Sequence, residues 1–310
     1  MPEYYLIPKK LARKAPFLAR MAQTCEAGLF RAVFWGLRRM SLESAYRFAG
    51  GVFSVVGPHT RKAAKAMANL EIAFPEESEE WRRQTVRDIF RSLGYAAVEL
   101  VKMDQIWDQR KERLEFVMSA ETREHVEAGR PAIMFCAHVG PWQVNNLIAR
   151  QYGLAVSTIY APESNPVFAG LMAKLRGEFG VGWISSEEGA RPLLRELQRG
   201  NMIGLAMDTR LDSGKLVPFF GREALTNTSA AGLALRTGAS FIPVRTERLP
   251  GCRFRLTLEP PLRCSIPDAP EREQALDLAL QVNQCFERWI RESPGEWICL
   301  KRRWPKAHKL

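Results

Sequence analysis

The chain has 310 residues, of which 46% are hydrophobic and 25% are charged, and its formal net charge is +11 at pH 7. This composition excludes a disordered chain and suffices for one large core, or for one domain with an appendage. The positive charge favours anionic partners, such as membrane headgroups, nucleic acid, phosphorylated substrates or an acidic protein.

The first 103 residues have the pattern of helices. Ser78 is placed to cap a helix whose apolar residues recur with a 3.6-residue period. This stripe consists of Val86, Ile89, Phe90, Leu93, Ala97 and Leu100. Positive charge collects near both ends of the chain, at Lys9-Lys10, Arg13-Lys14, Arg38-Arg39, Arg61-Lys62 and Lys301-Arg302-Arg303.

The N-terminal region has no cleavable signal peptide and no run of about 20 apolar residues that could cross a bilayer. Two shorter apolar stretches, residues 28–37 and 48–57, could lie in a membrane surface. In the first stretch, one helical face carries Phe30, Val33, Phe34 and Leu37. Burial of this face in a helical core is an equally good interpretation.

From about residue 130 the pattern changes to short apolar strands that alternate with helices. The predicted strands are Ala132–Ala137, Ala155–Tyr160, Ile203–Met207, Ser240–Thr246 and Phe254–Leu258. The helices between them are Trp142–Tyr152, Pro166–Phe179, Glu187–Gln198 and Ser229–Arg236, the last ending at Gly238. This alternation predicts an α/β fold, with a mostly parallel central sheet flanked by helices.

We therefore divide the chain into a helical, membrane-associating region at 1–103 and an α/β core at 104–310, which could also form one continuous domain. A final helix from about Ala269 is expected to start with a capping box made by Asp268 and Glu271. Its buried stripe is Ala275, Leu278, Val282, Phe286 and Trp289.

Two predicted strands end at reactive polar residues. His138 follows the first strand, and Asp208, with Arg210 two residues later, follows the strand that ends at Met207. In open α/β sheets ligands bind beyond the carboxyl ends of the strands, so neighbouring strands would place these residues in one crevice. Pro141 suits the first turn of a following helix, whose N-terminus would lower the pKa of His138 and bind an oxyanion.

Other residue types give little sign of bound metal. The six cysteines are scattered without a Cys-x-x-Cys pair, and the four histidines lack ligand spacing. We expect reduced thiols, no metal site and no cofactor.

The segment Phe219-Phe220-Gly221 reads as an exposed aromatic pair in a turn. Such a pair could form the apolar wall of an acyl-chain groove. A buried corner of the core is the simpler interpretation.

Several blocks, taken together, resemble the bacterial lipid A biosynthesis lauroyl/myristoyl acyltransferase family of the lysophospholipid acyltransferase superfamily. The block His138-Val-Gly-Pro-Trp-Gln143 is similar to the family's His-x-Gly-Asn-Trp-Glu. The other similar blocks, in chain order, are Asn69-Leu70 with Phe74-Pro75, Tyr160 and Pro162 with Asn165-Pro166, Asp208-Thr-Arg210, Phe219-Phe220-Gly221 with Thr226, Pro243-Val244 with Arg248, and Pro294-x-x-Trp297 with Arg302-Arg-Trp304.

The resemblance implies a membrane-associated acyltransferase that moves a fatty acyl chain from acyl carrier protein to a hydroxyl of a glycolipid such as a lipid A precursor. It implies His138 as general base, with Gln143 and Asp208 at the catalytic site. It assigns substrate binding to Gly140, Trp142, Asn165, Arg210, Phe219, Phe220, Thr226 and Arg248. It also implies an anionic membrane as partner, at the cytoplasmic face of the bacterial inner membrane, with the chain either monotopic or held by a single N-terminal anchor.

The chain departs from the family pattern at Gln143, which replaces an acid, at Ala161, where arginine is common, and at Lys301, where histidine is common. An amide can orient the histidine but brings no charge. Three explanations stay open: Asp208 supplies the charge, the enzyme uses another acceptor, or the chain is a non-catalytic lipid-binding relative or an engineered Glu-to-Gln form. Nucleic-acid binding is the weakest alternative, because no motif for it is present.

Overall fold

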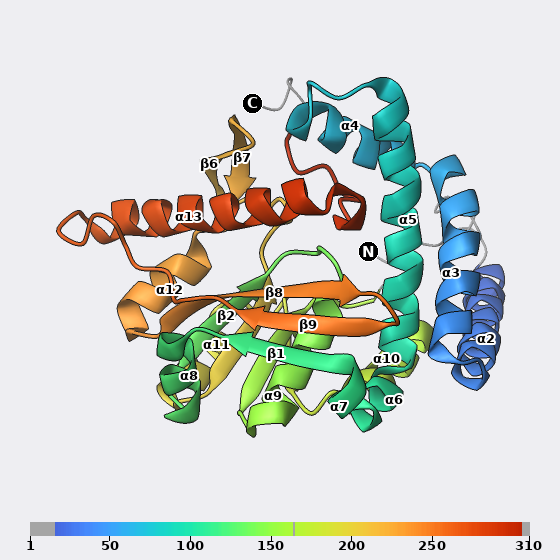
Figure 1. Cartoon of the computed structure of the whole chain (residues 1–310), viewed down its shortest axis with the longest axis horizontal. Helices are drawn as coiled ribbons and strands as arrows, with labels where there is room; N and C mark the ends of the chain where they lie inside the picture. Colours follow the sequence, from blue (N-terminus) through green and yellow to red (C-terminus); the bar gives the residue numbers. More distant parts are fainter. Residues whose placement is uncertain (1–15, 164, 306–310) are drawn as a thin grey trace.

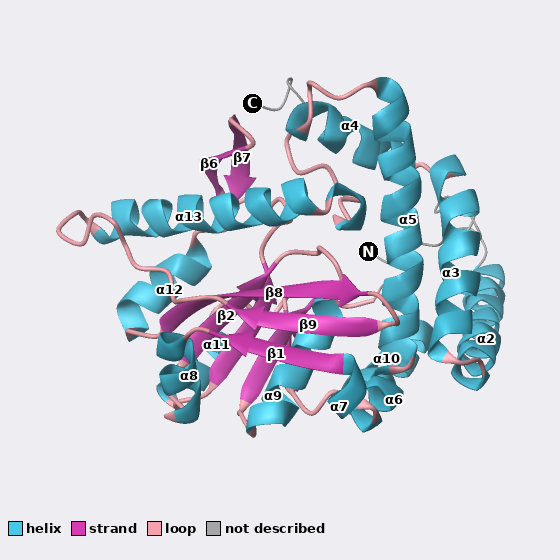
Figure 2. Cartoon of the chain, in the orientation of Figure 1, coloured by secondary structure: helices cyan, strands magenta, loops and turns pink. Residues whose placement is uncertain are grey.

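The structure is a computed structural model that describes residues 16–163 and 165–305, so the basic pairs Lys9-Lys10 and Arg13-Lys14 lie outside the described residues. A seven-stranded sheet occupies the centre of the molecule (Figure 2). Its strands are β1 (Leu114–Met118), β2 (Ala132–Cys136), β3 (Val156–Tyr160), β4 (Gly182–Ser185), β5 (Met202–Ala206), β8 (Ser240–Leu249) and β9 (Arg253–Leu258).

The strand order is β1-β9-β8-β2-β5-β3-β4. Every neighbouring pair is parallel except β8 and β9, which run antiparallel. The prediction of a mostly parallel α/β sheet is confirmed. A separate two-stranded hairpin consists of β6 (Lys215–Phe219) and β7 (Arg222–Thr226).

Helices cover both faces of the sheet and also stand beside it (Figure 1). They are α2 (Pro16–Arg39), α3 (Leu42–Val56), α4 (Ala63–Ala73), α5 (Glu79–Val101), α6 (Met103–Asp108), α7 (Arg110–Arg113), α8 (Ala120–Glu127), α9 (Leu147–Tyr152), α10 (Pro166–Gly177), α11 (Arg191–Gln198), α12 (Ser229–Thr237) and α13 (Glu271–Glu292). Short 3₁₀ helices are η1 (Gly57–His59), η2 (Trp142–Asn146) and η3 (Pro294–Glu296).

Two hydrophobic cores form because side chains of a strand alternate between the faces of the sheet. In β2, Ile133 and Phe135 join the core that contains α12 and α13, whereas Ala132 and Met134 join the core that contains α9 and α3. Burial on both faces explains why β2 reads as a continuous apolar run. Figure 1 shows α13 and α12 on one side of the sheet and α8 and α9 on the other.

The N-terminal helices stand beside the sheet, with α5 innermost and α3 and α2 farther out (Figure 1). Ser78 caps α5, as predicted, by accepting a hydrogen bond from the Trp81 backbone at 3.1 Å. Within the described residues, none of the helices combines the length and the apolar character that a bilayer crossing requires.

The predicted apolar face of α2 is divided. Phe30 and Val33 are exposed, but Leu37 is buried and Phe34 packs against the core. The expectation that all four could lie in a membrane surface is therefore wrong for Leu37. On α3 an exposed apolar stripe follows from the helical spacing of Phe48, Val52, Val55 and Val56.

Several boundaries differ from the sequence prediction. The predicted helix Trp142–Tyr152 is divided into η2 and α9, and the helix predicted from Glu187 starts only at Arg191. Asp268 does not cap α13, since Pro270 occupies the cap position and no side chain bonds there. The predicted buried stripe of α13 is confirmed at all five positions, and the predicted end of α12 at Gly238 is confirmed by its left-handed backbone (φ +67°).

Candidate functional site

His138 and Asp208 meet because of the register of two parallel strands. Cys136 pairs with Ala206 at the ends of β2 and β5, and each polar residue lies two positions further along. The His138 Nδ1 and Asp208 Oδ1 atoms are 2.6 Å apart. The side chain of His138 is 30% exposed, and that of Asp208 is 2% exposed. The pairing expected from the strand ends is thus present in the structure.

Both oxygens of Asp208 are occupied. Oδ1 contacts His138, and Oδ2 accepts a hydrogen bond from the Trp297 indole at 3.1 Å. Burial raises the pKa of Asp208, but the charge of His138 and these hydrogen bonds lower it by a larger amount. The net pKa is therefore below its ordinary value. Asp208 is therefore an ionised carboxylate at neutral pH.

The same pairing sets the titration of the ring. Burial lowers the pKa of His138, the Asp208 carboxylate raises it, Lys301 lowers it, and the net pKa lies above the ordinary value. The expectation that a helix N-terminus would lower this pKa is wrong. The segment after Pro141 is the short 3₁₀ helix η2, which offers no extended helix dipole, and the carboxylate dominates.

The loop that carries His138 is held by residues 296–298. The Ile298 N–H donates to the His138 carbonyl at 2.8 Å, and the Gly140 N–H donates to the Glu296 carbonyl at 3.3 Å. Gly140 has φ +62°, and a Cβ there would lie 2.5 Å from the Thr246 carbonyl oxygen. Its place in the motif thus reflects backbone geometry, and its amide is already engaged rather than free for substrate.

A cavity of about 260 Å³ opens beside His138, near the lower end of the range typical of small-ligand sites, roughly 300–1,000 Å³. Its polar lining consists of His138, Gln143, Asn145, Asn146, Thr158, Tyr160 and Arg176. Its apolar lining includes Leu100, Met134, Ile148, Ala149, Val156, Met172, Phe179, Leu205 and Val244. A lining that combines polar and apolar side chains suits an amphipathic ligand.

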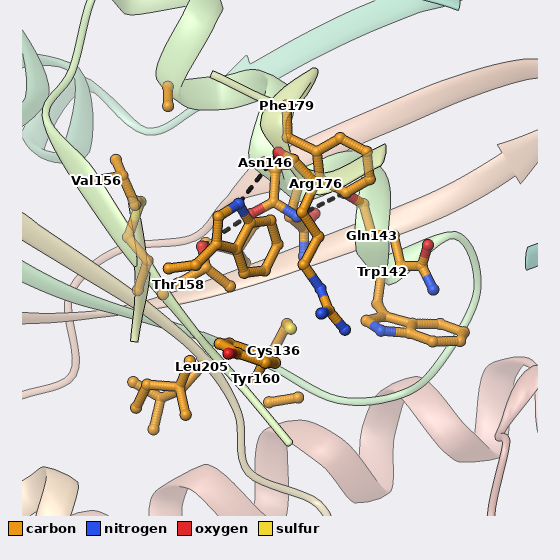
Figure 3. Close-up of a pocket in the computed structure, with 18 of the residues that line it drawn as sticks. Cys136, Trp142, Gln143, Asn146, Val156, Thr158, Tyr160, Arg176, Phe179 and Leu205 are labelled. Atoms are coloured by element: carbon orange, nitrogen blue, oxygen red, sulfur yellow. Dashed lines mark hydrogen bonds between the residues drawn. The ribbon is translucent and has the colours of Figure 1, made fainter. Parts of the chain in front are cut away.

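Figure 3 shows Trp142 and Gln143 at one end of this cavity and Val156 at the other, with the Arg176 side chain extending between them. Arg176 is paired with Glu163 and lies 4.4 Å from the centre of the Tyr160 ring. Thr158 donates a hydrogen bond to Asn146 at 2.8 Å (Figure 3). These contacts fix the polar lining without involving His138.

Gln143 lines the cavity but does not bond to His138. Its Oε1 is buried without a hydrogen-bond partner among the described residues. The carboxylate that faces the ring comes from Asp208 instead. Cys136 also lines the cavity, and burial together with Asp208 raises its pKa to about 12, so its thiol stays protonated and is a poor nucleophile at neutral pH.

The aromatic pair of the β6–β7 hairpin does not line the cavity beside His138. Phe219 is fully buried and Phe220 is 8% exposed, so the expected exposure is wrong and the buried-corner interpretation holds. Both rings pack with Trp297 and Trp304 because the hairpin folds back onto the core. Thr226 is buried too, and its hydroxyl accepts a bond from Arg303 at 2.6 Å.

Three further predicted substrate ligands lie away from the described cavity lining. Arg248 is bound in a buried ion cluster with Glu99 and Glu296. Asn165 is buried and donates to Glu26 at 3.0 Å, which ties α2 to the start of α10. Arg210 pairs with Asp212 at 2.7 Å. Among the described residues, Trp142 is the one predicted substrate ligand that lines this cavity, where it lies with the predicted catalytic residues His138 and Gln143.

Sequence reasoning missed Trp297 as a partner of Asp208, and Thr158, Arg176 and Gly204 as cavity residues. Only Gly204 carried a usable signal, because glycine inside a buried strand often marks a close approach. Across residues 16–163 and 165–305 no group of three or more His, Cys, Asp or Glu side chains is arranged to hold a metal ion.

Comparison with known proteins shows the family of this chain. The family model of bacterial lipid A biosynthesis acyltransferases matches residues 15–306. The lipid A biosynthesis lauroyltransferase of Escherichia coli (strain K12) is 29% identical over 280 residues, which cover 87% of this chain and 88% of the relative. The palmitoleoyltransferase of the same strain is 26% identical over 253 residues, 78% of each chain. A lipid A biosynthesis acyltransferase of Haemophilus influenzae (strain ATCC 51907 / DSM 11121 / KW20 / Rd) is 23% identical over 247 residues, which cover 77% of this chain and 74% of the relative. With a match over nearly its whole length, this chain belongs to the bacterial lipid A biosynthesis acyltransferase family.

Proposed function

We propose that this acyltransferase moves a fatty acyl chain from an acyl carrier protein thioester to a hydroxyl of a glycolipid such as a lipid A precursor. The observation that carries the proposal is the His138–Asp208 pair at the edge of an apolar cavity. Direct transfer needs no covalent enzyme intermediate, in agreement with the high pKa of the Cys136 thiol.

In the proposed reaction His138 is the general base. Because Asp208 binds Nδ1, that nitrogen carries the hydrogen and Nε2 is left with a lone pair. Nε2 takes the proton of the acceptor hydroxyl while the oxygen attacks the thioester carbonyl. The C–S bond then breaks, and the imidazolium returns the proton to the leaving thiolate, so that an ester and a free thiol result.

Asp208 takes the role of the missing family acid. A carboxylate on Nδ1 keeps the ring in the productive tautomer and stabilises the imidazolium that forms. Asp208 does this with a charge that is buried, ionised and fixed by Trp297. This arrangement favours an active enzyme over a non-catalytic relative, despite the amide at Gln143.

The cavity is proposed to hold the acyl chain. Much of its lining is apolar, so transfer of a hydrocarbon tail from water would be favourable by about 0.8 kcal/mol for each CH₂ that is buried. The carbonyl carbon would then lie beside His138, with the polar lining around the thioester. No metal or redox cofactor takes part in this scheme.

We further propose that the enzyme binds the cytoplasmic face of the bacterial inner membrane. The support is the exposed apolar stripe on α3, where Val55 is 67% exposed and Val56 is 58% exposed, together with the net charge of +11. Apolar side chains and positive charge together suit anionic lipid. The same charge suits docking of an acidic carrier protein.

The test supplies a labelled acyl carrier protein thioester and a purified lipid A precursor to the wild type, His138→Ala and His59→Ala. His59 is an exposed histidine and is the matched control. We expect acyl transfer by the wild type and the control, and a loss of about 10²–10⁴-fold in His138→Ala. Lipid binding without transfer by the wild type would favour a non-catalytic relative, and full activity in His138→Ala would refute the base role.

A further inference from the structure

A buried ion cluster lies next to the catalytic loop. Arg248 of β8 donates from Nε to Glu99 Oε1 at 2.7 Å and from Nη2 to Glu99 Oε2 at 3.2 Å. Its Nη1 donates to Glu296 Oε1 at 3.0 Å and to the Ser92 hydroxyl at 2.8 Å. The Tyr46 hydroxyl donates to Glu99 at 2.5 Å. Arg248 and Glu99 together thus join α3, α5 and β8 to η3.

The cluster is charged and rigid. The Glu99 side chain is fully buried and that of Arg248 is 9% exposed. Burial lowers the pKa of Arg248, but Glu99 and Glu296 raise it more, so the net pKa is above its ordinary value. A guanidinium fork bonded at three nitrogens has little freedom to move, so Glu296 is held at a defined place.

Glu296 begins the segment 296–298, which contacts both members of the pair. Its carbonyl accepts the Gly140 N–H, Trp297 donates from its indole to Asp208, and the Ile298 N–H donates to the His138 carbonyl. Trp297 also forms an antiparallel bridge with Val139. Three consecutive residues therefore fix the backbone of the histidine and the side chain of the aspartate.

The ion cluster and the loop that carries His138 are closely packed. A Cβ on Gly140 would lie 2.5 Å from the Thr246 carbonyl oxygen and 3.1 Å from Glu296 Oε2. Thr246 and Arg248 belong to the same strand, β8. The loop is thus enclosed by β8 on one side and by Glu296 on the other. A displacement of Glu296 would therefore displace the loop that carries His138.

We propose that Arg248 and Glu296 are positioning residues, which hold His138 and Asp208 in hydrogen-bond contact through the segment 296–298. This inference rests on the proposed function, in which His138 and Asp208 carry out the catalytic step. It also replaces the substrate-binding role that the sequence suggested for Arg248. Neither positioning residue needs to touch the substrate.

The test removes the Glu296 carboxylate, because loss of Arg248 would leave Glu99 buried and unpaired and could unfold the protein. The variants are Glu296→Ala, Glu296→Gln and the control Glu247→Ala, which breaks the neighbouring Arg245 pair without touching the segment 296–298. The readouts are the pKa of His138, measured by NMR titration of its imidazole, and kcat and KM for acyl transfer.

Other charged groups near the pair also affect the pKa of His138. Asp208 raises the pKa of His138, Lys301 lowers it, and the buried Arg303 acts on Asp208. In Glu296→Ala we expect the pKa of His138 to fall, and kcat to fall about 10–100-fold with KM little changed, because the pair loosens. Glu296→Gln can still accept from Arg248 and should recover most of both values. Glu247→Ala should leave both unchanged.

Two results would overturn the proposal. An unchanged His138 titration in Glu296→Ala would show that the cluster does not set the geometry of the pair. Equal shifts in the Ala and Gln variants would mean that Glu296 acts only through its charge. The NMR readout does not depend on turnover, so it decides this inference even if the wild type transfers no acyl group.

Discussion

The family pattern has an acid five residues after the histidine, within the same motif. In this chain the carboxylate that contacts His138 is Asp208, which follows a different strand. Position 143 lies on η2, five residues after the histidine, whereas Asp208 follows β5 and reaches the ring because β2 and β5 end in register. Within the described part of the chain, Asp208 is the carboxylate in hydrogen-bond contact with His138, and Gln143 at the family's acid position is neutral.

The titration of the ring gives a prediction for pH. His138 accepts a proton only when neutral, and its pKa lies above the ordinary value of 6.5. Acyl transfer should therefore fall as the pH drops through a midpoint above 6.5. Asp208→Asn removes the charge that raises this pKa, so the midpoint should move downward. The measurement is kcat/KM against pH for both proteins. A wild-type midpoint that lies below that of the variant would contradict the assignment.

Gly204 gives a prediction for chain length. It lines the cavity, and a Cβ there would lie 3.1 Å from the Thr158 hydroxyl. Gly204→Val should shorten the space for the acyl chain and lower the kcat/KM ratio of long to short donors about 10–100-fold. Gly170→Val is the control, since no atom lies within 4 Å of its Cβ. An unchanged ratio in Gly204→Val would place the acyl chain elsewhere.

At the scale of elements, helix α3 has one face that packs against the protein and one face that is exposed. Tyr46 points into the ion cluster, while Phe48, Val52, Val55 and Val56 are exposed. The double change Val55→Glu and Val56→Glu should weaken binding to anionic vesicles about tenfold or more, because it replaces apolar contact with repelled charge. Val117→Glu, at an exposed position on β1, should bind like the wild type in a sedimentation assay. Equal binding by all three proteins would remove α3 from the membrane contact.

The central strands could be predicted from the sequence, and the edges of the sheet could not. Burial on both faces makes β2 and β5 apolar throughout, so their ends, His138 and Asp208, could be located. The edge strands β1 and β4 are short and partly exposed, and their residues show no clear period. The hairpin was missed because an apolar turn reads alike whether it is exposed or folded back onto the core.

The cavity shows why much of the candidate site could not be predicted from the sequence. Its lining comes from α5, β2, η2, α9, β3, α10, β4, β5 and β8, which meet only in the folded chain. Strand register could be used to bring two residues together, since parallel strands end at one edge. No local pattern reveals that Arg248 and Phe219 turn inward, because that depends on partners far away in the sequence.

On the scale of the whole molecule, the sheet separates two cores, and the N-terminal helices take part in both. Leu70 and Phe90 belong to one core, and Ala45 and Val98 belong to the other. The helices that carry the exposed apolar side chains are thereby built into the same framework as the catalytic loop. A membrane bound at α3 and an acyl chain bound beside β5 would be held by one continuous structure.

The central claim is that Asp208, and not residue 143, supplies the charge for His138. The most direct measurement compares acyl transfer by Asp208→Asn and Gln143→Met with that of the wild type under the same conditions. By analogy with hydrolase triads, Asp208→Asn should lose about 10³–10⁴-fold in kcat. Gln143→Met should lose less than about tenfold, since it removes no charge and no hydrogen bond to His138. The reverse ranking, with Gln143→Met inactive and Asp208→Asn active, would contradict the account.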